Sequence, residues 1–245
     1  MNGYGPLAPW YDLLTGDVPY AAFADYYEAG FARCGGGYRL LLDLCCGTGT
    51  LAAEMSRRGY ELIGVDASVE MLMQAREKCE DLACPPLFLA QKAEELDLYG
   101  TVDACYCSLD GIDHIAPEAL PEVFRRLHFF VRPGGLVIFD VFSPERFRAL
   151  DGQVFVDETE DVFCVWRADL QEDRNAVLYG MDLFERSGEL WRRRGEEEIE
   201  YAHEPAHIME LLSAAGFDRI ELRTDGPQNE QGRLMILAVR GDNDG

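Results

Sequence analysis

Basic residues are scarce in this 245-residue chain, which has 22 Lys and Arg against 45 Asp and Glu and a formal net charge of −23. This excess of negative charge repels nucleic-acid backbones and anionic membrane surfaces, so we expect neither as a partner. The one dense basic run, Arg192–Arg194, is followed at once by Glu196–Glu198. Neighbouring opposite charges of this kind are typical of a solvated face.

Several sequence patterns are missing as well. The eight cysteines form no Cys-x-x-Cys pair and show no zinc-ligand spacing, so we expect reduced thiols and no metal. We find no signal peptide and no apolar run long enough to span a bilayer. These absences favour a cytoplasmic protein that is not attached to a membrane.

The most informative stretch is an apolar run followed by a glycine turn. Leu40–Leu44 is typical of a strand that is buried on both faces of a parallel sheet. Gly47 and Gly49 then allow a sharp turn and a close approach of a ligand to the backbone. Helix-forming residues follow at Leu51–Met55. Strand, glycine turn and helix together predict a nucleotide-type binding crossover.

A second crossover supports the first. Glu61–Asp66 is a short apolar strand that ends in an acid, and Ser68 is placed to cap the next helix. Asp66 lies 66 − 47 = 19 residues after Gly47, where a carboxylate can accept hydrogen bonds from both ribose hydroxyls. The run Gly47–Ala52 also fits the Gly-x-Gly-x-x-Ala pattern of NAD-dependent dehydrogenases, which leaves that class as an alternative.

The remaining chain predicts an α/β fold, because strands alternate with helices. Further strands are expected at Leu87–Ala90, Val102–Cys107, Leu136–Val141, Phe217–Arg223 and Arg233–Arg240, with helices at Pro117–Phe130 and Pro205–Ala215 and a turn at Arg132–Gly135. We therefore predict a mostly parallel seven-stranded sheet with helices on both faces and an antiparallel last strand.

Two segments fall outside this alternation. The aromatic-rich residues 1–37 predict two short helices across the ligand end of the sheet, either as a cap on the core or as a substrate lid. Residues 151–202 show alternating apolar and polar positions separated by polar turns, which predicts a small antiparallel insertion over the active site. The core would then comprise residues 1–150 and 203–245.

With these motifs in order, the chain resembles the class I S-adenosylmethionine-dependent methyltransferases. The resemblance rests on Trp10–Leu14 with Asp17–Tyr20, Leu42–Thr50, Gly64–Ser68 with Met71 and Leu72, Arg132–Gly135 and Ala214–Phe217. It implies a Rossmann-like core and transfer of a methyl group from S-adenosylmethionine, which leaves S-adenosylhomocysteine, to a small-molecule amine or hydroxyl. The negative charge and aromatic cap suit a small neutral or cationic acceptor such as an amine, and the protein would be a monomer or a homodimer.

The resemblance also implies roles for individual residues. The turn that contains Gly47, Thr48 and Gly49 would hold the methionyl part of the cofactor. Asp43 would bind its amino group, Asp66 its ribose, and Tyr11 would close over it. The remaining implied cofactor contacts are Cys45 beside the carboxylate, Ala67, Met71, Ala93 and Glu94 around the adenine, and Ser108, Leu109 and Asp110 at the methyl-transfer end.

One position departs from the family pattern. Cys45 stands where these enzymes usually have glycine. A left-handed backbone at this position would be strained by the cysteine side chain.

The methyl group is displaced in line, so the protein mainly binds, aligns and desolvates the reactants. His114 follows the fourth predicted strand and is the candidate base, because a histidine can accept a proton near neutral pH. It could instead be a loop histidine that is hydrogen-bonded to Asp110 or Asp113. A further alternative is a non-catalytic member of the fold that binds the cofactor or a partner.

Overall fold

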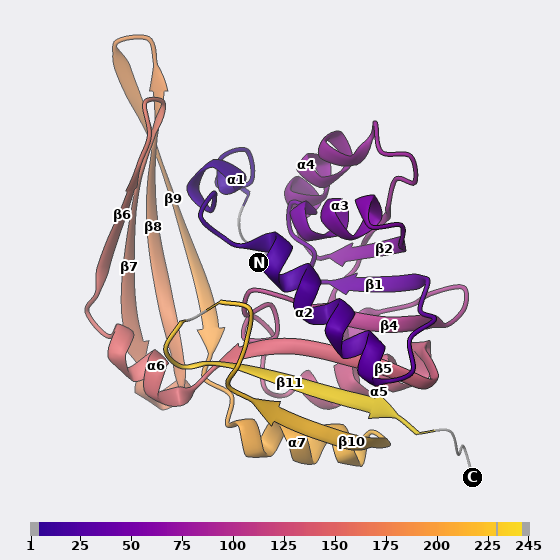
Figure 1. The fold of residues 1–245 in the computed structure, drawn as a ribbon. Coiled ribbons are helices and arrows are strands. Elements are labelled where there is room, and N and C mark those ends of the chain that lie inside the picture. The colour runs from indigo at the N-terminus through magenta and orange to yellow at the C-terminus, as the bar shows by residue number, and fades with distance from the viewer. Residues whose placement is uncertain (1–4, 229, 242–245) are drawn as a thin grey trace.

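The computed structural model describes residues 5–228 and 230–241, and within them the core is a sheet of seven strands (Figure 1). Their order is β10-β11-β5-β4-β1-β2-β3. β1 to β5 run parallel, and β11 is antiparallel to both β5 and β10, as predicted. The strands are β1 Leu40–Leu44, β2 Glu61–Asp66, β3 Leu87–Ala90, β4 Val102–Cys107, β5 Val131–Phe142, β10 Phe217–Arg223 and β11 Arg233–Arg240.

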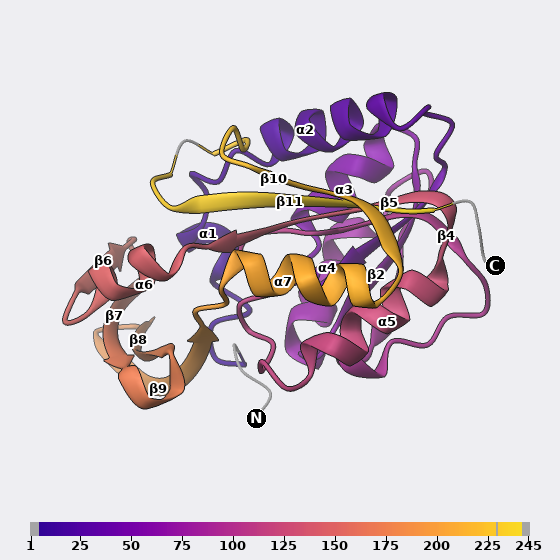
Figure 2. The ribbon, with the colours of Figure 1, turned by 90° about the horizontal axis from the view of Figure 1, so that it is seen from below.

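Helices cover both faces of this sheet (Figure 2). On one face, α2 (Tyr20–Arg33) and α3 (Thr50–Arg57) pack against apolar side chains of β1, β4, β5 and β11, and α4 (Val69–Cys79) lies beside α3. On the other face lie the short helix η1 (Ala93–Glu95), α5 (Leu120–Phe130) and α7 (Pro205–Ala214).

The N-terminal prediction needs a correction. Instead of two short helices across the ligand end, α1 (Tyr11–Leu14) is a single turn and α2 is a helix of 14 residues that lies along the face of the sheet. Phe23 and Tyr27 are fully buried against the sheet, because the aromatic residues of α2 recur on one side of the helix. α2 is therefore part of the core, and only the segment around α1 remains near the ligand end.

A second sheet holds the predicted insertion. It has four antiparallel strands, β6 Val154–Glu158, β7 Val162–Gln171, β8 Ala176–Ser187 and β9 Leu190–Tyr201, with a short helix η2 (Glu172–Arg174) at the β7–β8 turn. The helix α6 (Pro144–Leu150) precedes it. Figure 1 shows α1 between this sheet and the core. Leu7 and Trp10 pack against apolar side chains of β7 and β8, so the N-terminal segment is attached to the insertion.

β5 also starts earlier than predicted. It begins at Val131, and Arg132–Gly135, expected to be a turn, lie within an irregular stretch where the pairing register with β4 shifts. In the described residues, no helix is both long enough and apolar enough to cross a membrane.

Asp103, on β4, fixes the start of the central strand. Its Oδ2 accepts hydrogen bonds from the backbone amides of Arg39 at 2.7 Å and Leu40 at 2.9 Å, and its Oδ1 accepts one from Arg132 Nε at 2.6 Å. Although partial burial acts in the opposite direction, the Arg132 guanidinium and the two amides lower the pKa of Asp103 below its ordinary value.

We therefore expect Asp103→Ala to lower the free energy of unfolding by about 2–3 kcal/mol at pH 7, because three donors lose a charged acceptor. A carboxyl group whose pKa is lower in the folded state stabilises the fold fully at a pH above its unfolded-state pKa of about 4. This stabilisation is lost as the pH falls from there through the folded-state pKa. The gap between wild type and variant in urea unfolding should thus shrink below pH 4. Replacing the exposed Asp81 by Ala is the control, and a gap that does not depend on pH would contradict the assignment.

Candidate functional site

A cavity of about 390 Å³ lies at the carboxyl ends of β1, β2 and β4. This is the edge where open α/β sheets bind ligands. The sequence-predicted residues that line it are Tyr11, Asp43, Cys45, Gly47, Thr48, Asp66, Ala67, Met71, Ala93, Glu94, Ser108, Leu109, Asp110 and His114. The structure therefore brings residues from seven separate stretches of the chain to one cavity.

The two glycines of the turn have different roles, one at the cavity wall and one in helix packing. Gly47 has φ 51°, and a Cβ built on it would meet no atom within 4 Å, so its backbone is open to a ligand. Gly49 is absent from the cavity lining. It has φ 70°, and its Cβ would lie 2.8 Å from the Ala75 Cβ. Gly49 thus allows α3 to pack closely on α4, and its contact with a cofactor stays a prediction.

Asp66 holds the glycine turn in place. Its Oδ2 accepts a hydrogen bond from the Gly47 amide and its Oδ1 one from the Ser68 amide, both at 2.8 Å. Each carboxylate oxygen has a second lone pair, so each can still accept a hydroxyl donor. Burial raises the pKa of Asp66, and the amides of Ser68 and Gly47 oppose this rise. The carboxylate can therefore bind a diol while it orders the turn.

Asp43 is a buried carboxyl group on the cavity wall, 2% exposed. Its Oδ2 makes no well-formed hydrogen bond with the described residues, although the Tyr106 hydroxyl lies close to the carboxyl group. Burial raises the pKa of Asp43 well above its ordinary value. A buried acceptor of this kind suits a ligand that brings an ammonium group.

Cys45 has φ 56°, in the left-handed region. The sequence predicts strain if this backbone is left-handed. The strain is therefore present, because a residue with a Cβ is disfavoured in that region. The Cys45 thiol is within hydrogen-bonding reach of Cys107 on the adjacent strand, and this contact together with burial raises the pKa of Cys107 well above its ordinary value. Cys45 thus reaches the cavity at a conformational cost.

The loop that follows β4 is tied down at several points. Leu109 and Asp110 have φ values of 56° and 55°. The Asp110 amide donates to Asp140 Oδ2 at 3.0 Å, and Asp110 Oδ1 accepts from Arg233 Nη1 at 2.9 Å. The Ser108 and Tyr27 hydroxyl oxygens are 2.6 Å apart. A loop held from both sides can keep its side chains in a defined position.

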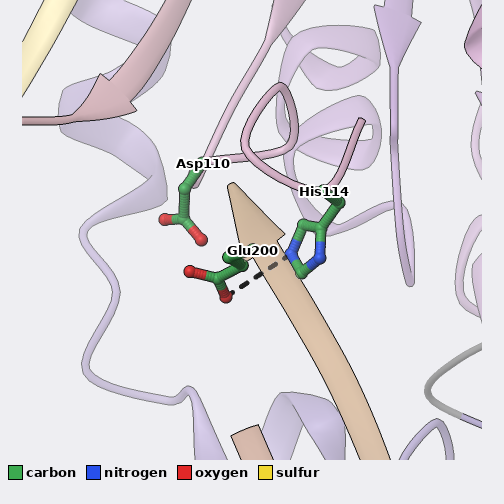
Figure 3. Close-up of side chains that lie close together, drawn as sticks. All are labelled: Asp110, His114 and Glu200. Atoms are coloured by element: carbon green, nitrogen blue, oxygen red, sulfur yellow. Dashed lines mark ion pairs between the residues drawn. The ribbon is translucent and has the colours of Figure 1, made fainter. Parts of the chain in front are cut away.

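His114 faces a glutamate that the sequence reading missed. Its Nε2 is 3.7 Å from Oε1 of Glu200, at the end of β9, and Figure 3 shows Asp110 beside this pair. Burial lowers the pKa of His114, opposed by Asp110 and Asp66. Burial, reinforced by Asp110, raises the pKa of Glu200 well above its ordinary value. The pair thus favours neutral forms that can accept or share a proton.

Carboxyl groups dominate this end of the cavity. The Asp110 carboxylate lies close enough to Asp113, Asp140 and Glu200 to reinforce the rise of their pKa values that burial causes, and Arg233 is the guanidinium among them. One ligand atom from each of Asp110, His114 and Glu200 lies within 4.8 Å of the others, a spacing that could hold a metal ion. Because Arg233 already binds the Asp110 carboxylate, the site is better suited to a proton or a single positive charge.

The insertion contributes more than the sequence indicated. The charge pattern of Glu196–Glu198 predicts a solvated face. In the structure, Glu198 lines the cavity and Glu200 is buried. The signal was the alternation of a strand, which sends Glu196, Glu198 and Glu200 to one side. Other lining residues that were not predicted are Tyr20, Leu44, Cys46, Thr50, Leu51, Val65, Ser68, Gln91, Lys92, Gly111, Ile115, Ala116 and Ala119.

Known proteins match this arrangement over nearly the whole chain. A model of the methyltransferase domain matches residues 41–135. The candidate methyltransferase YqeM of Bacillus subtilis (strain 168) is 28% identical, with 97% of each chain covered. The structure of an S-adenosylmethionine-dependent methyltransferase from Clostridium acetobutylicum superimposes with a TM-score of 0.85 at 26% identity, covering 98% of this chain and 100% of the other. Residues 41–135 thus match a methyltransferase domain, and the chain has the fold of the class I S-adenosylmethionine-dependent methyltransferases.

The domain match and the S-adenosylmethionine-dependent structural neighbour make S-adenosylmethionine the cofactor, in place of the NAD-dependent alternative. The fold agrees with a second solved structure, the sugar N-methyltransferase KedS8 from Streptoalloteichus, at a TM-score of 0.81 and 24% identity over 97% of this chain and 94% of the other. The cavity of this methyltransferase fits the cofactor's polar groups: Asp43 offers an acceptor, Asp66 two further lone pairs, and Gly47 an open backbone.

The left-handed backbone of Cys45 predicts that a Gly variant is more stable than an Ala variant at this position, the reverse of the usual order. In an ordinary backbone, Gly is less stable than Ala by about 0.5–1 kcal/mol. At the φ of Cys45 the Cβ costs about 1–2 kcal/mol, so Cys45→Gly should be more stable than Cys45→Ala by about 1 kcal/mol in urea unfolding. The same two substitutions at the exposed Cys84 should keep the ordinary order. An ordinary order at Cys45 would show that its backbone is unstrained.

Proposed function

We propose that this methyltransferase transfers the methyl group to an amine nitrogen of a small-molecule acceptor. The observation that carries the proposal is the group formed by Asp110, His114 and Glu200 at the wall of the cofactor cavity. S-adenosylmethionine supplies the electrophilic methyl group when it is bound. The protein has to place the acceptor in line with it and remove a proton.

Each part of the cavity has a role in this proposal. Asp43 accepts hydrogen bonds from the cofactor's ammonium group, and Asp66 accepts them from the ribose hydroxyls. Tyr11 covers the cofactor from the N-terminal segment. The backbone of Gly47 approaches the methionyl part, with Thr48 and Cys45 beside it. The adenine would be bound by Ala67, Met71, Ala93 and Glu94, and the methyl-transfer end by Ser108, Leu109 and Asp110.

His114 is the proposed catalytic base. Its lowered pKa keeps the imidazole neutral at physiological pH, so that it can accept a proton from the acceptor. Glu200, 3.7 Å away, can stabilise the imidazolium that forms. We propose that this chemistry needs no metal, because Arg233 already engages Asp110.

The surplus of carboxyl groups favours an amine over a hydroxyl acceptor. Asp110 and Glu198 give this end of the cavity negative charge, which attracts a protonated amine, and Glu200 adds a buried carboxyl oxygen that can accept a hydrogen bond. The fold shared with the sugar N-methyltransferase KedS8 and with the amino pentose methyltransferase CalS10 from Micromonospora echinaspora (TM-score 0.75, 19% identity, covering 91% of this chain and 92% of the other) supports the same choice. A hydroxyl acceptor remains the alternative for the same base.

The proposal is tested first by calorimetric titration with S-adenosylmethionine, S-adenosylhomocysteine and NAD in parallel. We expect micromolar binding of the first two and none of NAD. The acceptor screen then compares amino sugars with the matching hydroxyl sugars, and methylation of the amines alone is expected. Cofactor binding with no turnover of any amine or hydroxyl would favour a non-catalytic member of the fold.

Replacement of His114 by Ala should leave the affinity for S-adenosylhomocysteine unchanged and lower kcat by about 100-fold, because the variant loses a general base. In wild type, kcat should fall as the pH drops through the lowered pKa of His114, below about 6.5. This acidic limb should be absent from the variant.

The matched control is His207→Ala, since the His207 side chain is 60% exposed. It should retain the wild-type kcat and pH profile. An unchanged kcat in the His114 variant would remove the histidine from the reaction and leave proton transfer to water or to a carboxylate.

A further inference from the structure

A group of polar contacts at the edge of the cavity ties the N-terminal segment to the glycine turn. Asp12, on α1, accepts hydrogen bonds at Oδ1 from the Thr48 hydroxyl at 2.6 Å and the Thr50 hydroxyl at 3.0 Å. Lys78, in the last turn of α4, places its Nζ 2.6 Å from Asp12 Oδ2. The same Nζ donates to Thr48 at 3.2 Å and to Thr50. One lysine therefore joins α1, the turn and the start of α3.

The residues on either side of Asp12 connect it to other parts of the molecule. Tyr11 lines the cofactor cavity. The Trp10 indole donates to Glu185 of β8 at 2.9 Å, and the Gly5 amide donates to Glu196 of β9 at 3.2 Å. Residues 5–14 are thus held on one side by the insertion and on the other by Asp12, and Tyr11 lies between these two attachments.

We propose that Lys78 is a positioning residue that acts through Asp12 to hold Tyr11 and residues 5–14 closed over the bound cofactor. This inference rests on the proposed cofactor site. Lys78 does not line the cavity, so it acts on the cofactor only through the groups that it holds. We name this group of four residues, Asp12, Thr48, Thr50 and Lys78, the clasp.

The strength of the clasp suits a contact that opens on each turnover. The side chains of Lys78 and Asp12 are 23% and 44% exposed, so solvent screens part of their attraction. A charge-assisted contact of this kind raises the ratio of closed to open conformations by a factor of about 5 to 20. It would slow the release of S-adenosylhomocysteine without locking the product in.

The first test measures the rate of S-adenosylhomocysteine release by stopped flow. Lys78→Met should speed release by about 5- to 20-fold and raise the KM for S-adenosylmethionine, while kcat stays within about twofold of wild type or rises. Asp12→Asn should act similarly. The double variant should add little to either single change, because both remove the same contact. Lys78→Arg should restore most of the slow release.

The control is Arg57→Met, which removes a cation from the neighbouring helix α3. The Arg57 side chain is 56% exposed, and its nearest ion-pair distance to Glu54 is 4.0 Å. It should leave the release rate unchanged. A lower melting temperature for Lys78→Met with a wild-type release rate would show a purely structural role and overturn the proposal. Additive effects in the double variant would also overturn it.

A second test does not depend on the cofactor. The chain has two lysines, Lys78 and Lys92, so acylation by acetic anhydride can be followed at each by mass spectrometry. In the free protein Lys78 should react more slowly than the exposed Lys92, and Asp12→Asn should speed its reaction. Equal rates at both lysines in wild type would overturn the clasp. If wild type shows this protection but binds no S-adenosylhomocysteine, the proposed function fails and with it the role of the clasp in cofactor release.

Discussion

The structure of the active-site end depends on one buried guanidinium. Arg233, on β11, has a side chain that is 5% exposed and contacts Asp140 of β5, Asp110 of the loop after β4, and Glu230. Removing one partner of such a group leaves an uncompensated buried charge, which is strongly destabilising. The contacts join the antiparallel part of the sheet to the loop that carries His114. The position of the proposed base is therefore set by a strand that is remote in sequence.

Three separate parts of the chain enclose the cavity, and each contributes a different chemistry. The parallel core supplies Asp43, Asp66 and the glycine turn, which are suited to a cofactor with ammonium and hydroxyl groups. The insertion supplies Glu198, which lines the cavity, and Glu200, which lies beside His114 at the proposed acceptor end. The N-terminal segment supplies Tyr11. Enzymes that share the core can therefore change their acceptor by changing the insertion, while the cofactor-binding residues stay the same.

The sequence predicted the core closely because the apolar run of β1 is followed by the turn that contains Gly47 and Gly49, and the mostly apolar run of β2 ends in Asp66. The bounds of β1 and β2 agree with the predicted strands, as do those of β10 and β11. The errors arose where tertiary context decides. The aromatic residues of α2 indicated burial but not against which surface, and alternation along β9 could not show that the side of Glu198 and Glu200 faces a cavity. The left-handed backbone of Cys45 follows from the turn that Gly47 and Asp66 impose, since a cysteine gives no local signal for it.

The place of β11 in the sheet also bears on the order in which the protein is completed during synthesis. β11 comprises residues 233–240, yet it lies between β5 and β10. Until it is added, β5 has an unpaired edge, and the carboxyl groups of Asp140 and Asp110 have no guanidinium beside them. The earlier strands β1 to β4 can pair before that point, as domains fold during translation from the N-terminus. The acceptor end therefore matures last, so a chain truncated before residue 233 would retain the glycine turn and lose the support of the loop that carries His114.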